Sequence, residues 1–187
     1  ILAALQDDDS AYVRRSVANH LNDIAKDHPQ LVVDWVRRHL PDASVERRAL
    51  LSHASRTLIK QGDAGMLALW GAGEAFNGRC TLKVSPSRIT VGDSVQLTLT
   101  LRSTSKASQA LLIDYAVHHV KADGRTSAKV FKGWKLKLAA GESRTLTKRH
   151  SFKPVTTRRY HAGRHAIDVS VNGGVAATAH VQLNLRR

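Results

Sequence analysis

The sequence predicts an α+β protein of two domains, an all-α domain over residues 1–73 and an all-β domain over residues 77–187. Hydrophobic residues follow a helical period in the first part and a period of two in the second. The charge changes at the same place, because residues 77–187 hold 20 of the 29 lysines and arginines and only 5 of the 15 acidic residues. The second part therefore has a formal charge of +15 and the first 76 residues one of −1, which favours two small domains over one large one.

Helix-period segments separated by stop signals make up the first part. Asp7-Asp8-Asp9-Ser10 is rich in N-cap residue types, Pro29 suits a first helical turn, and Gly62-Asp63 ends a helix. Helix lengths and tight breaks match the antiparallel helix pairs of HEAT-like repeats, with an ordinary small helical bundle as the alternative. Four helices are predicted, over residues 11–27, 29–40, 45–61 and 64–70.

Alternation of apolar and polar residues predicts strands in the second part. Asn172-Gly173 between valines indicates a hairpin, because both residues tolerate positive φ. Seven strands in a segment of this length are typical of an immunoglobulin-like sandwich. His165 stands where such sandwiches place a corner aromatic, so we interpret it as a corner residue rather than a ligand. The predicted strands cover residues 81–84, 95–101, 111–120, 130–138, 144–152, 165–171 and 177–185.

Several classes of site are not indicated. The histidines of the second part lack the paired spacings and cysteine partners of a zinc site, so we expect no metal. The sequence has neither a Gly-rich phosphate loop nor a nucleophile elbow, and we expect no cofactor. No apolar run is long enough to cross a bilayer, and the single Cys80 fits a reducing compartment, so a cytoplasmic protein is expected. The chain opens on Ile1 in a segment of helical texture, which predicts further sequence upstream.

The excess positive charge of the second part predicts a polyanion such as nucleic acid as the partner. Each phosphate that a basic residue neutralises releases condensed counterions and so contributes to affinity. A basic face that is merely solvated is the alternative.

Four segments carry a resemblance to a known family. The stretch from Tyr12 to Pro29 resembles the final helical repeats of the AlkC branch of HEAT-like DNA alkylation-repair glycosylases. The segments 129–132, 150–153 and 156–165 resemble the immunoglobulin-like domain that some members of that branch carry at the C-terminus. The order of helices followed by a sandwich is more specific than either part. The chain is thus similar to the C-terminal part of a bacterial AlkC-type glycosylase.

This resemblance implies excision of cationic alkylated bases from duplex DNA by hydrolysis of the N-glycosidic bond. It implies neither a membrane nor a protein partner, and it places the protein with the bacterial nucleoid. Asp23, at the flank of the polar face of the 11–27 helix, matches the position of a catalytic carboxylate that stabilises positive charge on the sugar. Other acidic residues of the family's active site would lie upstream, so we expect the chain alone to be inactive.

The resemblance also implies that the β domain and the helices clamp DNA through phosphate contacts of little sequence preference. A non-enzymatic adaptor that binds a protein or polysaccharide is the alternative, although such partners do not require +15 on one domain. The predicted DNA-binding residues are Arg14, Arg15 and Arg56 in the helical part, and Lys129, Lys132, Lys153, Thr156, Thr157, Arg158, Arg159 and Arg164 in the β part.

Overall fold

The computed structural model describes residues 1–156 and 158–185. The chain forms two compact units. The helical unit covers Ile1–Glu74, and the β unit begins at Ala75. Among the described residues, none of the helices has both the length and the apolar character that crossing a membrane requires.

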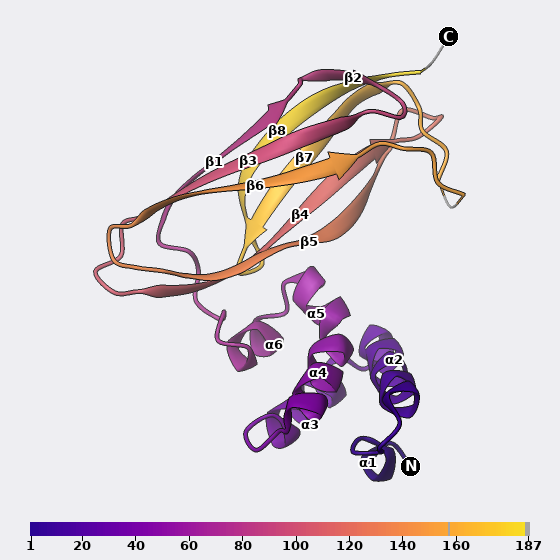
Figure 1. Cartoon of the computed structure of the whole chain (residues 1–187), viewed down its shortest axis with the longest axis vertical. Coiled ribbons are helices and arrows are strands. Elements are labelled where there is room, and N and C mark those ends of the chain that lie inside the picture. The colour runs from indigo at the N-terminus through magenta and orange to yellow at the C-terminus, as the bar shows by residue number, and fades with distance from the viewer. Residues whose placement is uncertain (157, 186–187) are drawn as a thin grey trace. The chain divides into compact units, whose positions relative to one another are not determined.

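The helical unit contains helices of unequal length. Three of them have ten residues or more, and the other three have four to six. The buried side of α2 carries Val17 and Leu21, which pack with Val36 of α3 and Leu51 of α4 in one core. The helices are α1 (Leu2–Leu5), α2 (Ala11–Asp27), α3 (Pro29–His39), α4 (Val45–Ala54), α5 (Arg56–Gln61) and α6 (Ala64–Leu69) (Figure 1).

The prediction of a HEAT-like all-α repeat domain is wrong. In a repeat array, similar helix pairs stack so that each pair contacts only its neighbours. Here α2 contacts α1, α3, α4 and α5, and the described helices surround one shared core rather than a series of equivalent ones. The chain is an α+β protein in which a small helical unit is joined to a larger β unit.

The predicted helix over 45–61 is divided at Ser55. This residue is fully buried, and its hydroxyl donates to the Leu51 carbonyl (2.7 Å) and accepts from Trp70 Nε1 (3.0 Å). The buried Asn22 accepts a hydrogen bond from the Thr57 amide (3.0 Å) and so replaces a helical partner at the start of α5. Side chains distant in sequence thus determine the break.

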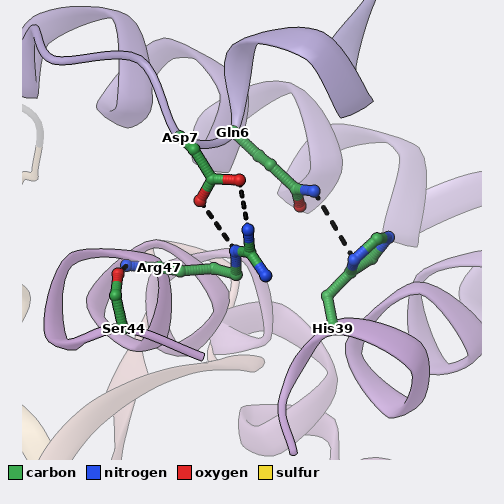
Figure 2. Close-up of polar contacts among 5 residues, drawn as sticks. All are labelled: Gln6, Asp7, His39, Ser44 and Arg47. Carbon is green, nitrogen blue, oxygen red and sulfur yellow. Dashed lines mark hydrogen bonds and ion pairs between the residues drawn. The ribbon is translucent and has the colours of Figure 1, made fainter. Parts of the chain in front are cut away.

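Polar contacts attach the segment after α1 to the rest of the helical unit (Figure 2). The Arg47 guanidinium forms a two-pronged ion pair with Asp7, which lowers the pKa of that carboxyl. Gln6 lies within hydrogen-bonding distance of His39 (3.5 Å), and Ser44 caps α4 by accepting from the Arg47 amide (3.1 Å). These contacts join α1, α3 and α4.

The β unit is a sandwich of two sheets (Figure 1). One sheet has three strands in the order β1-β3-β6, and the other has five in the order β2-β8-β7-β4-β5. All pairings are antiparallel except that of β2 with β8. The strands are β1 (Gly78–Ser85), β2 (Arg88–Thr90), β3 (Ser94–Ser103), β4 (Gln109–Val120), β5 (Thr126–Leu138), β6 (Ser143–Ser151), β7 (Gly163–Val171) and β8 (Gly174–Asn184).

The described residues form one strand more than the seven predicted. The additional strand, β2, is only three residues long, so it carries too little alternation to be recognised from sequence. The interpretation of His165 as a corner residue is confirmed. Its ring is fully buried, and Nε2 donates to the His161 carbonyl (3.1 Å), four residues upstream.

A β-bulge at Gly133 sets which residues of β5 point outward. Ile113 pairs with Trp134 and Asp114 with Lys132, so Gly133 is the extra residue. A Cβ at this position would lie 2.4 Å from the Ile113 carbonyl oxygen, which explains the glycine. The Gly133 amide donates instead to the buried Asp114 side chain (3.2 Å).

Candidate nucleic-acid interface

Each aspartate and glutamate side chain of the β unit accepts a hydrogen bond from another residue of the unit. Turns and bulges have unpaired backbone amides, and a nearby carboxylate satisfies them. Two of the five carboxylates also form ion pairs with arginines, Asp123 with Arg125 and Glu142 with Arg144. Five negative charges cannot offset the 20 lysines and arginines of the unit, so its net charge stays strongly positive. The five are Asp93, Asp114, Asp123, Glu142 and Asp168, which accept from Thr90, Gly133, Arg125, Ala139 and Thr178 respectively.

Three of the predicted DNA-binding residues lie together around one hollow. The connection between β6 and β7 brings Lys153, Arg158 and Arg159 to a surface hollow of about 650 Å³. The apolar part of its lining includes Pro154 and Leu185. A basic rim around an apolar floor can hold a phosphate and a sugar or base edge together.

The Arg158 side chain is held in place by its surroundings. A short bridge pairs Val155 with Arg158, and the Arg158 amide donates to the Val155 carbonyl (3.2 Å). The guanidinium lies 5.8 Å from the centre of the Tyr160 ring, a cation–π distance. Thr156 lies exposed in the same turn, whereas Thr157 is outside the described residues.

Lys129 and Lys132 lie elsewhere, on the exposed edge strand β5. Sequence reasoning missed Lys135 and Lys137, which point outward on the same strand beyond the bulge, and Lys148 of β6. Lys148 Nζ donates to the Lys132 carbonyl (2.8 Å) and lies 5.7 Å from the centre of the Trp134 ring. The alternation of lysine and leucine over residues 135–138 could have indicated that these lysines point outward. Lysines on an edge strand also prevent edge-to-edge association, so their presence alone does not indicate a ligand.

The remaining predicted contacts are dispersed. Arg164 is exposed at the second position of β7, opposite Gln182 of β8. In the helical unit, Arg14 and Arg15 line a hollow of about 380 Å³ between α2 and α4. Arg14 also has a structural role, since its Nη1 donates to the carbonyls of Asp8 (2.5 Å) and Asp9 (2.8 Å). Arg56 is exposed at the start of α5.

Asp23 lies on the open face of α2. Its side chain is 67% exposed and forms an ion pair with Lys26 at 2.7 Å. The hydrogen bond from Lys26 lowers the pKa of the Asp23 carboxyl, so the group is ionised at neutral pH. Asp23 does not line the α2–α4 hollow, which Arg14, Arg15 and His53 border. Within the helical unit its surroundings are those of a solvated helix face.

Three histidines are buried between the sheets of the β unit. His119, His150 and His165 lie in an aromatic cluster with Phe152 and Tyr160. Burial lowers the pKa of His119 to about 3 and that of His150 to about 4, and the nearby Arg158 contributes to both shifts. The described part of the chain has no group of three or more metal-ligating side chains placed to hold an ion, and these rings are neutral members of the core.

The comparison with protein families matches the β unit. Residues 79–185 fit a family described as the C-terminal Ig-like domain of uncharacterised protein YhaZ. The chain belongs to the YhaZ family. The match covers more than half of the sequence and agrees with the two-sheet sandwich that the structure shows.

Two relatives of this YhaZ-family chain match nearly its whole length. YhaZ of Bacillus subtilis is 38% identical over 188 residues, which cover 98% of the chain and 51% of that protein. The structure of the Pseudomonas fluorescens alkylpurine DNA glycosylase AlkC, bound to DNA containing an abasic site analogue, is 38% identical with a TM-score of 0.89. That match covers 98% of the chain and 51% of AlkC. The chain therefore spans about half the length of both relatives.

Proposed function

We propose that this chain binds duplex DNA in alkylation repair, as the C-terminal half of a DNA glycosylase of the AlkC type. The observation that carries the proposal is the match to AlkC bound to DNA, at 38% identity and a TM-score of 0.89 over 98% of the chain. This match includes both the helical and the β unit. It is far more specific than a shared immunoglobulin-like fold, which many unrelated functions use.

The charge distribution supports DNA as the ligand. The β unit carries a large excess of lysine and arginine, and its carboxylates are used in turns and bulges. Lys153, Arg158 and Arg159 form the most concentrated set of predicted contacts, around the hollow beside the β6–β7 connection. Contacts of such residues with phosphates would hold the duplex without reading its sequence, as a search for damaged bases requires.

The proposed reaction is excision of a cationic alkylated base. Such a base departs as a neutral molecule, so the enzyme mainly has to stabilise the positive charge that develops on the sugar and to position a water molecule. A carboxylate serves both purposes. Asp23 is the candidate for this carboxylate within the chain. It is exposed and paired with Lys26, and a charge in water interacts weakly with other charges, so the proposal requires that further groups exclude water around Asp23 when DNA is bound.

DNA binding is tested on the chain by fluorescence anisotropy with a duplex that contains an abasic-site analogue, at increasing salt. We expect log Kd to rise linearly with log salt, and Arg158→Gln/Arg159→Gln to reduce the slope by about 1 to 2. The matched control is Arg37→Gln/Arg38→Gln, a second pair of adjacent arginines, on α3 of the near-neutral helical unit. Binding that does not respond to salt, or equal effects of the two pairs, would contradict the proposal.

Excision is tested on a protein of the length of the two relatives, with duplex DNA treated with a methylating agent. We expect release of methylated bases in single turnover, and loss of release when residues 77–187 are removed from a protein that stays folded. Asp23→Asn should lower the rate by about 100-fold or more if the carboxylate acts as proposed. Asp27→Asn, on the same helix, is the matched control. An Asp23→Asn protein with the normal rate would exclude Asp23 but leave the glycosylase proposal intact.

A further inference from the structure

The outer face of the three-stranded sheet is a regular grid of side chains. The registers of β1 with β3 and of β3 with β6 place outward residues in four rows across the three strands. Four rows of three give twelve outward residues, of which none is acidic and none is apolar. A solvated sheet face usually carries both positive and negative side chains. The threonines and cations of this face are Thr81, Thr98, Thr100, Thr145 and Thr147, with Arg79, Lys83, Arg102 and Arg149.

Two of these cations lie directly opposite each other. Arg79 of β1 pairs with Arg102 of β3, and neither forms an ion pair with another described residue. Like charges opposite each other in a sheet are destabilising. The fold therefore holds together two guanidinium groups that an anion would stabilise.

A hollow lies beside this arginine pair. Arg79 and Arg102 line it together with Ser103, Thr104 and Gly141, and its volume is about 430 Å³. The Thr104 hydroxyl donates its proton to Asn77 (2.8 Å), whereas the Ser103 hydroxyl accepts from Gln109 (2.9 Å) and keeps its proton for another acceptor. Two guanidinium groups around a small polar hollow are the chemistry that recognises a phosphate or another oxyanion.

The rest of the grid continues this chemistry along the sheet. Successive outward residues of a strand are about 7 Å apart, so the four rows extend over about 20 Å. This length corresponds to the rise of about six base pairs of duplex DNA. Thr100 and Thr145 lie 3.3 Å apart through their hydroxyls in the second row, and Lys83 and Arg149 lie in the third and fourth rows.

We propose that this outer face is a second site for the DNA backbone, with Arg79 and Arg102 holding one phosphate and the threonine hydroxyls donating to neighbouring phosphates. The choice of DNA rests on the proposed function. An acidic protein fits less well, because the face has no apolar or aromatic side chain for the core of a protein interface. Neither arginine lines the hollow beside the β6–β7 connection, so the two sites can be altered separately.

The test compares Arg79→Gln/Arg102→Gln with Arg88→Gln/Lys121→Gln, which removes two exposed charges of the β unit that lie outside the grid. Binding of a fluorescent undamaged duplex is measured from 50 to 300 mM KCl. We expect the arginine variant to lower the slope of log Kd against log salt by about 1 and the control to leave it unchanged. Thr100→Val/Thr145→Val, which keeps the shape of both side chains, should weaken binding a few-fold at every salt concentration.

The outcomes separate this inference from the proposed function. If the Arg79/Arg102 variant binds like its control while the Arg158/Arg159 variant is weakened, the second site is wrong and the proposed function stands. If the unaltered chain binds no DNA at low salt, both are wrong. Polyglutamate is also tested as a competitor for the labelled duplex. If it competes as well as DNA of equal charge, and if its binding requires the same two arginines, the ligand of this face is an acidic protein and the proposal of DNA is wrong. Circular dichroism of each variant checks that its secondary structure is the same as that of the unaltered chain.

Discussion

The two units of the chain use their charged residues differently. In the helical unit, cations pair with carboxylates on the surface, as Lys26 does with Asp23 and Arg37 with Asp34 one turn earlier. In the β unit, Asp123 pairs with Arg125 and Glu142 with Arg144, but the unit has only five acidic residues for 20 lysines and arginines. Charge in the first unit is thus balanced locally, whereas charge in the second is available to a ligand.

The cores differ in a related way. In the helical unit, the buried Asn22 and Ser55 accept and donate hydrogen bonds that fix the start of α5. In the β unit, the buried polar groups include three histidines, and both ring nitrogens of His119 have no partner among the described residues. The helical core therefore depends on hydrogen bonds, and the β core depends on rings that remain neutral.

Acid should affect the β unit most, and this is the largest effect that we expect. The pKa values of His119 and His150 are lowered to about 3 and about 4 in the folded unit. Below pH 6.5 these two side chains therefore bind protons in the unfolded chain but not in the folded unit. The contribution of these two histidines to the free energy of unfolding is therefore present above about pH 6.5 and is lost as the pH falls. The loss is about 1.4 kcal/mol per pH unit for each histidine, or about 5 kcal/mol for the two between pH 6.5 and 4.5. Urea unfolding at several pH values, followed by residue-resolved hydrogen exchange, measures this loss.

The matched variant for this prediction is His119→Leu, which removes one of the two buried rings, a ring with no hydrogen-bond partner among the described residues, and should lower the steepness of the pH dependence by about half. A helical unit that loses as much stability as the β unit over this range would show that the buried ring cluster is not the cause.

Adding one methyl group should act oppositely in the two units. Gly133→Ala places a Cβ 2.4 Å from the Ile113 carbonyl oxygen, and we expect a loss of about 2 to 3 kcal/mol because backbone must move. Gly65→Ala, inside α6, meets its nearest atoms at 3.4 Å and should stabilise the helical unit by up to about 1 kcal/mol. Chemical denaturation of both variants measures the difference. Equal effects would mean that the bulge can relax without cost.

Removing a buried acceptor should have a smaller effect. Asn22→Ala leaves the Thr57 amide without its partner, and we expect the helical unit to lose about 1 to 2 kcal/mol. Asn19→Ala, whose side chain is exposed and bonds His53 at 2.8 Å, should cost clearly less. The same denaturation experiment compares the two. If both variants behave alike, the break before α5 does not depend on Asn22.

The smallest effect is expected for Asp23→Asn. The side chain lies on the solvated face of α2, and exposed ion pairs contribute little to folding. Its thermal midpoint should therefore equal that of the unaltered chain within error, as differential scanning calorimetry can show. A clear shift would mean that Asp23 has a structural role, and any loss of excision in the variant would then need a different explanation.

Much of the fold was predictable because it depends on local patterns. The helix over Ala11–Asp27 matches the prediction at both ends, since a polar N-cap segment and Pro29 mark its limits. Strands with several alternating residues were also found, whereas the three residues of β2 carry too little pattern. The HEAT-like repeat was wrong because helix spacing along the chain does not reveal whether successive helix pairs share one core.

The candidate sites show the same limit. Lys153, Arg158 and Arg159 were predicted, and they are close in sequence, so one connection brings them to one hollow. The pair Arg79 and Arg102 was not predicted, because the two residues are more than twenty positions apart and become neighbours only through the register of β1 with β3.

The sequence by itself determined the change from helices to strands near residue 76 and the excess of positive charge after it. Both are sums over neighbouring residues, and folding does not alter them. Only the tertiary structure decided which cations have carboxylate partners, which histidines are buried, and where the helix over residues 45–61 is divided. These properties depend on distances between residues that are far apart along the chain, and folding alone sets those distances.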